Sequence, residues 1–128
     1  MAPRVLLIEP SSDLRRDFAG ALERRGLEVR AAVSAEQALA VCTAFSPDII
    51  IADHDLGDER AAGFLRELRR KNPGIVVLLT SDAFATEQKI GTTTLFPKPS
   101  EPRALLGLLK RAVTADSLWH VRREPAAG

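Results

Sequence analysis

The stretch Pro47-Asp48-Ile49-Ile50-Ile51-Ala52-Asp53-His54-Asp55-Leu56-Gly57-Asp58 decides the fold, because its apolar run stops abruptly at a cluster of acidic residues. A helix-breaking proline precedes the run and Gly57 follows it, so the isoleucine-rich segment is typical of a strand buried on both faces. Asp53 is then expected at the carboxyl end of this strand. In an α/β sheet that edge is where ligands bind.

Four other short segments are expected to be strands. Three are continuous apolar or β-branched runs and one has a weaker alternation; in chain order they are 4–8, 27–32, 75–79 and 93–96. Between the strands, apolar residues at helical spacing predict amphipathic helices, with Ser34 as a cap and Gly26 as a terminator. The helix expected over 83–90 is short and has few apolar residues. A final helix is expected to begin at Ser100-Glu101-Pro102.

The alternation of five strands with five helices predicts parallel βαβ units with right-handed crossovers. Helices must then cover both faces, so the fold class is α/β, a doubly wound five-stranded parallel sheet. We expect one domain over residues 1–113. Residues 114–128 lose the helical periodicity and form a tail, either an extension of the last helix or a flexible segment.

The composition excludes several classes of protein. The chain has 128 residues and a net charge of +1, which argues against a strongly electrostatic partner such as duplex DNA. Its one cysteine excludes an internal disulfide and a cysteine-based metal site. No apolar run approaches the roughly 20 residues of a membrane span, and the N-terminus has no signal-peptide pattern. We therefore expect a cytoplasmic protein without a membrane partner.

Reactive side chains follow four of the expected strands: Glu9, Asp53, Thr80 and Lys98. Because the carboxyl ends of parallel strands share one edge, these groups are expected to gather there. A carboxylate can attack phosphorus and form an acyl phosphate. A hard divalent cation, a lysine and a hydroxyl can then offset and bind the anionic group. The pattern indicates a phosphoryl-handling site, although Glu9 has a second interpretation as a cap of the first helix.

With these four residues in this order and at these strand ends, the chain resembles a response-regulator receiver domain of two-component signalling. The resemblance extends to about residue 113. The resemblance implies that Asp53 is the phospho-acceptor, that Thr80 orients the phosphoryl group and that Lys98 pairs with it. It also implies a Mg²⁺ site formed by Glu9, Asp53 and the backbone carbonyl of Asp55.

The resemblance further implies the strand order 2-1-3-4-5 of flavodoxin-like folds and a cis peptide before Pro99. The chain departs from the family in three places. Pro10 stands where the family usually has a second acidic residue, which weakens the Mg²⁺ site. Leu95 replaces the aromatic switch residue three positions before the lysine, and the segment between Thr80 and Lys98 is about one helical turn short.

The resemblance implies a stand-alone receiver, not an enzyme, that takes a phosphoryl group from a histidine kinase or phosphotransfer protein onto Asp53. Output is expected through protein contact, without direct nucleic-acid binding, from a monomer or weak homodimer. One alternative, motivated by Pro10 and Leu95, is a pseudo-receiver that binds a partner without phosphate. Another is a phosphatase that uses Asp53 and Asp55, which have the Asp-x-Asp spacing of haloacid-dehalogenase-like enzymes. In those enzymes the motif follows the first strand, whereas here it follows the third.

Overall fold

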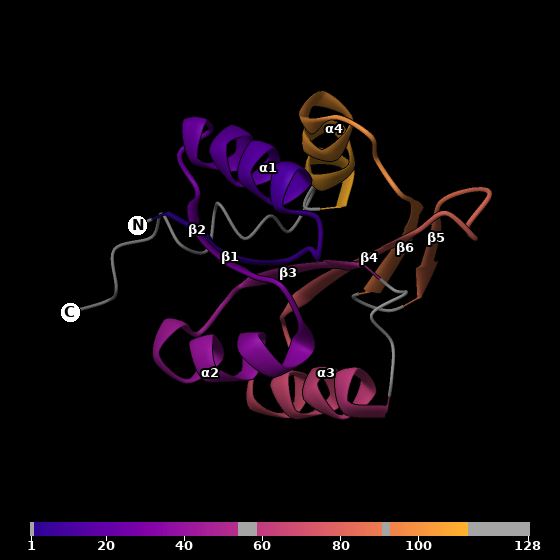
Figure 1. Ribbon diagram of the computed structural model, residues 1–128. Coiled ribbons are helices and arrows are strands. Elements are labelled where there is room, and N and C mark those ends of the chain that lie inside the picture. Colours follow the sequence, from indigo (N-terminus) through magenta and orange to yellow (C-terminus); the bar gives the residue numbers. More distant parts are fainter. Residues whose placement is uncertain (1, 54–58, 91–92, 113–128) are drawn as a thin grey trace.

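A six-stranded sheet separates two layers of helices in the computed structural model (Figure 1). The structure describes residues 2–53, 59–90 and 93–112. From edge to edge, the strand order is β2-β1-β3-β4-β6-β5. The strands are β1 (Arg4–Ile8), β2 (Glu28–Ala32), β3 (Ile49–Asp53), β4 (Val76–Ser81), β5 (Gln88–Ile90) and β6 (Thr93–Pro97).

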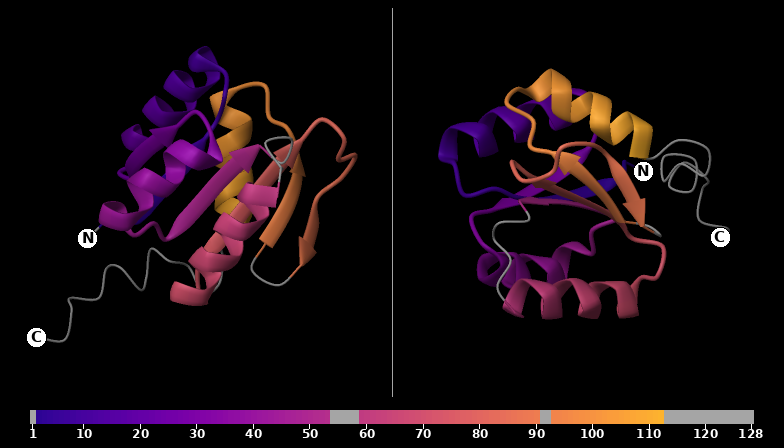
Figure 2. Two further views of the ribbon diagram at one scale, coloured as in Figure 1. Left: turned by 60° about the horizontal axis from the view of Figure 1, so that its bottom comes forward. Right: turned by 90° about the vertical axis from the view of Figure 1, so that its right-hand side faces the viewer.

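Among the described residues, two helices cover each face of the sheet. They are α1 (Ser12–Arg24), α2 (Ala35–Phe45), α3 (Glu59–Lys71) and α4 (Pro102–Ala112). The helices α1 and α4 lie side by side on one face, and α2 and α3 on the other, as Figures 1 and 2 show. This arrangement confirms the expected α/β class. Within the described ranges, no helix has the length and apolar character needed to cross a membrane.

The strand β3 lies at the centre of the parallel part of the sheet. All five of its residues are buried, and its backbone pairs in parallel with β1 on one side and β4 on the other. Ile49 and Ile51 pack in the core beneath α1 and α4, whereas Ile50 packs in the core that faces α2 and α3. The continuous apolar run is thus explained by burial on both faces.

Serine side chains cap the start of α1 and of α2, and a glycine follows the end of α1. The Ser11 hydroxyl oxygen accepts the Leu14 N–H at 3.3 Å, and the Ser34 hydroxyl oxygen accepts the Gln37 N–H at 3.2 Å. These bonds satisfy donors that the first helical turn leaves without a partner. The chain leaves α1 through Gly26, whose φ of +88° lies in the left-handed region that glycine adopts without steric cost.

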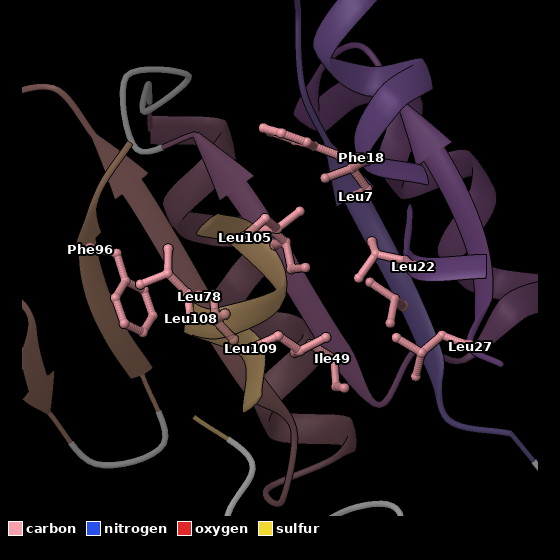
Figure 3. Close-up of a cluster of buried hydrophobic side chains, with 12 residues drawn as sticks. Leu7, Phe18, Leu22, Leu27, Ile49, Leu78, Phe96, Leu105, Leu108 and Leu109 are labelled. Atoms are coloured by element: carbon pink, nitrogen blue, oxygen red, sulfur yellow. The ribbon is translucent and has the colours of Figure 1, made fainter. Parts of the chain in front are cut away.

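Buried side chains fill the space between the sheet and the α1–α4 layer (Figure 3). The helix α4 contributes Leu105, Leu108 and Leu109, and α1 contributes Phe18 and Leu22. Full burial of each such side chain is worth about 1.5–3 kcal/mol. This packing fixes α4 against the sheet, and with it the segment that joins β6 to α4.

The segment between β4 and β6 differs from the prediction. The sequence predicts a short helix over 83–90, whereas the structure has a turn followed by β5, so this prediction is wrong. A helical crossover needs about a dozen residues or more, and only residues 82–92 join the two strands. The segment instead bonds to the free edge of β6, antiparallel to it, with Gln88 opposite Leu95. The five parallel strands keep the expected order, and β5 adds a sixth.

Two leucines on helices test the packing of α4. Leu105 of α4 is 0% exposed, whereas Leu39 of α2 is 47% exposed. We expect Leu105→Ala to lower the free energy of unfolding by about 2–5 kcal/mol, and Leu39→Ala by no more than about 0.5 kcal/mol. Urea unfolding followed by circular dichroism measures both. Similar losses in the two variants would contradict the burial of α4.

Candidate functional site

The predicted site residues share the carboxyl edge of the parallel strands. Alternate residues of a strand point to one face, and those beneath α1 and α4 come from odd positions of β1 and β3 and even positions of β4 and β6. Continued to the strand ends, this alternation leads to Glu9, Asp53, Thr80 and Lys98. Asp53 and Thr80 stand opposite each other in the β3–β4 ladder. The alternation of side chains along each strand therefore directs all four side chains to the same face of the sheet, at its carboxyl edge.

The ammonium group of Lys98 joins the two carboxylates. Its Nζ lies 2.6 Å from Asp53 Oδ2 and 3.2 Å from Glu9 Oε1. The side chains of Glu9 and Asp53 are only 4% and 8% exposed, and that of Lys98 is 18% exposed. Such charge-assisted contacts are stronger than neutral hydrogen bonds. These three described side chains, one cation and two anions, carry a formal net charge of −1.

Burial and the two carboxylates act on Lys98 in opposite directions. Burial alone lowers the pKa of the ammonium group, because it disfavours the charged form. The hydrogen bonds and charges of Asp53 and Glu9 outweigh this effect and raise the pKa above its ordinary value. Lys98 is therefore protonated at neutral pH.

A backbone hydrogen bond to Ser81, which the sequence did not predict, holds the backbone of Lys98 in position. The Lys98 N–H donates to the Ser81 carbonyl oxygen at 3.1 Å, and Ser81 is fully buried at the end of β4. The described chain has no cis peptide bond, so the cis peptide implied before Pro99 is wrong. The trans form is the more stable one for most bonds to proline. No sequence pattern marks Ser81, because only the β4–β6 pairing brings its carbonyl to Lys98.

Glu9 makes the helix-cap contact that was its second interpretation, and it also contacts the lysine of the cluster. Its Oε2 accepts the backbone N–H of Ser11, the cap of α1, at 2.9 Å. Its Oε1 faces Lys98. One carboxylate oxygen therefore stabilises the start of the helix while the other takes part in the ion pair.

Thr80 lies one strand away from Asp53 and is 4% exposed. Its hydroxyl group donates to the Ala52 carbonyl oxygen at 3.4 Å. This bond is long for a hydroxyl donor. The hydrogen bond to Ala52 therefore holds the Thr80 hydroxyl only weakly.

The donor set meets the minimum for a hard divalent cation. Mg²⁺ is usually bound through one or two carboxylates, with waters and phosphate oxygens completing its shell, and Glu9 and Asp53 supply two carboxylates. Pro10 adds no side-chain ligand, and Asp55 lies outside the described residues. In the part of the chain that is described, no group of three His, Cys, Asp or Glu side chains could hold a metal. Glu9 and Asp53 would therefore hold Mg²⁺ together with water and phosphate oxygens rather than in a cage of protein side chains.

Comparison with known proteins identifies relatives among response regulators. The model of the response regulator receiver domain matches residues 5–110. The response regulator protein FleR of Pseudomonas aeruginosa is 32% identical over 116 residues, 87% of this chain and 24% of FleR. The photosynthetic apparatus regulatory protein RegA of Rhodovulum sulfidophilum is 30% identical over 104 residues, 77% of this chain and 57% of RegA. The chain thus spans less than two thirds of the length of either relative.

Solved structures agree on the fold. The chemotaxis response regulator CheY4 of Vibrio cholerae superposes with a TM-score of 0.69 and 22% identity, over 88% of this chain and 99% of CheY4. The family match includes Glu9, Asp53, Thr80 and Lys98. This chain therefore belongs to the response regulator receiver domain family of two-component signalling.

Proposed function

We propose that this receiver domain accepts a phosphoryl group on Asp53 from a histidine kinase or a phosphotransfer protein. The observation that carries the proposal is the contact of a nearly buried Asp53 carboxylate with the Lys98 ammonium group at 2.6 Å. A carboxylate is a known covalent acceptor of phosphoryl groups. A fixed cation beside it stabilises the charge of the transferring group.

In the proposed step, one Asp53 carboxylate oxygen forms a bond to phosphorus while the bond between phosphorus and the donor breaks. The bonding electron pair leaves with the donor, which for a kinase is a histidine nitrogen, and the product is an acyl phosphate. By analogy with other phosphorylations, the group brings about −1.5 to −2 charges. Lys98 neutralises part of this charge, and Thr80 exchanges its long bond to Ala52 for one to a phosphoryl oxygen.

We assign the Mg²⁺ site to Glu9, Asp53 and the backbone carbonyl of Asp55. When bound, the ion offsets the negative charge on the phosphoryl oxygens. Because Pro10 supplies no carboxylate and Lys98 already neutralises one of the two present, the attraction for the cation is reduced. We therefore expect phosphorylation to need a high Mg²⁺ concentration.

The proposed cellular role is that of a cytoplasmic signalling module rather than a turnover enzyme. Receiver domains in general interact with histidine kinases or phosphotransfer proteins. We propose that this domain passes its signal on by contact with a protein partner and does not itself bind nucleic acid. Its action as a stand-alone protein and its state as a monomer or weak homodimer stay predictions.

Formation of the acyl phosphate is the direct test. Incubation of the chain with Mg²⁺ and a small acyl-phosphate donor should add the mass of one phosphoryl group, and chelation of Mg²⁺ should slow the reaction. Asp53→Asn should abolish the adduct, because the amide is not a nucleophile toward phosphorus. Asp13→Asn on α1, where the side chain is 80% exposed, should leave it unchanged. The proposal fails if intact-mass spectrometry finds no adduct with either this donor or the cognate kinase.

The ion pairs of Lys98 make a separate prediction about stability. Lys98→Met leaves two buried carboxylates without their cation, and we expect a loss of about 1–3 kcal/mol in the free energy of unfolding at neutral pH. Because the folded-state pKa of Lys98 is raised, this contribution is fully present below the unfolded pKa of about 10.4. It declines as the pH rises through the higher folded-state pKa.

Urea unfolding of the unchanged chain and of Lys98→Met, from neutral pH to about pH 11, measures this difference. Lys110→Met, at an exposed position of α4, serves as the control and should show little loss. A difference for Lys98→Met that stays constant into the alkaline range would argue against the paired ammonium group.

A pseudo-receiver that binds its partner without phosphate is the second candidate function. Pro10 and Leu95 favour it, and so does the absence of any helix in the described residues between β4 and β6. Leu95 stands beside Phe96, which packs beneath α4, so the Leu95 side chain points to the opposite face, the side of α3. An aromatic switch at this position is missing, which removes one way of reporting phosphorylation.

Partner binding distinguishes the two functions. The test is to cross-link the protein to its partner in the cells that make it and to measure how much partner is recovered. It compares the unchanged chain with Asp53→Ala and with the control Asp13→Ala. A pseudo-receiver predicts equal recovery of the partner with all three chains. Loss of the partner with Asp53→Ala alone would instead support output that depends on phosphorylation.

A further inference from the structure

The side chain of Arg15 contacts the turn between β1 and α1. Its Nη1 donates to the Glu9 carbonyl oxygen at 2.9 Å and to the Pro10 carbonyl oxygen at 3.4 Å. The Arg15 backbone N–H donates to the Ser11 carbonyl oxygen at 2.9 Å, so Arg15 stands one turn after the helix cap. A helical side chain points back toward the N-terminus of its helix. The guanidinium group is therefore placed over the turn that carries Glu9.

This turn directs the Glu9 carboxylate to Lys98. Glu9 Oε2 accepts the Ser11 N–H at 2.9 Å, while Oε1 lies 3.2 Å from Lys98 Nζ. Both contacts require one conformation of residues 9–11. Pro10, at the centre of the turn, fixes its own φ but supplies neither a backbone N–H nor a polar side chain to its neighbours. The Glu9 and Pro10 carbonyl oxygens accept hydrogen bonds from Arg15 instead.

We propose that Arg15 is a positioning residue of the Asp53 site: it fixes the turn by binding the Glu9 and Pro10 carbonyl oxygens and so keeps Glu9 directed at Lys98. The consequence for phosphorylation rests on the proposed function, whereas the positioning of Glu9 does not. Without the guanidinium group, Lys98 loses a fixed Glu9 as one of its two anionic partners. The ammonium group is then held beside Asp53 less firmly.

The neighbouring Arg16 offers a matched control on the same helix. Its side chain is 74% exposed and pairs with Asp13 at 3.3 Å and Asp17 at 3.7 Å. It has the same charge and length as Arg15, but its recorded partners are exposed side chains of α1. A loss of helix stability or of net charge should thus affect both arginine variants, whereas a loss of Glu9 positioning should affect Arg15 alone.

The test combines an NMR signal with a reaction rate, using the whole chain labelled with ¹⁵N. The Ser11 amide proton reports on its hydrogen bond to the Glu9 carboxylate, without phosphoryl donor or Mg²⁺. Arg15→Ala should move this resonance upfield and slow acyl-phosphate formation by about tenfold, the low end of what loss of an orienting residue usually costs. Arg15→Lys should restore part of both effects. Arg16→Ala should leave both unchanged.

An unmoved Ser11 resonance in Arg15→Ala overturns the proposal, as does an equal loss of rate in the two alanine variants. Arg15→Gln, which keeps a hydrogen-bond donor, replaces Arg15→Ala if thermal unfolding shows that the latter does not fold. If the unchanged chain accepts no phosphoryl group, the proposed function fails, but the Ser11 resonance still decides whether Arg15 positions Glu9.

Discussion

One ammonium group placed between two buried carboxylates is the interaction on which the carboxyl edge depends. Glu9 follows β1, Asp53 ends β3 and Lys98 follows β6, so the contact ties together strands that are far apart in the sequence. Two carboxylates so near each other repel when no cation lies between them. Lys98 reduces this repulsion but leaves a formal charge of −1 on the three side chains, which suits the proposed binding of a cation and of an anionic phosphoryl group.

The site is supported from both sides by elements that pack in one core. The leucines of α4 hold the segment that begins at Lys98, and α1 holds the turn that carries Glu9 through its cap, Ser11. Because α1 and α4 lie side by side, we expect a displacement of Glu9 or of Lys98 to disturb the same helical layer.

Next to β6, an edge strand takes the place of the helix that the sequence predicts between β4 and β6. The connection after β4 is too short for a helical crossover, so its backbone hydrogen bonds are made by β5 at the edge of the sheet. This leaves Leu95 half-buried on the side of α3, while its neighbour Phe96 is fully buried beneath α4.

By itself, the sequence determined the features that arise from local patterns: the α/β class, the buried strand that ends in Asp53, the Ser34 cap, and the expectation that four reactive residues share one edge. Strand-forming runs and helix caps act over a few residues, so they are visible without the fold. Only the tertiary structure decided that Lys98 contacts both Glu9 and Asp53, that Ser81 places Lys98, that residues 88–90 form an edge strand rather than a helix, and that Arg15 spans the Glu9 turn. The first three depend on strand register and on a free sheet edge, and the last on a side chain folding back over the turn, so none is encoded in local periodicity.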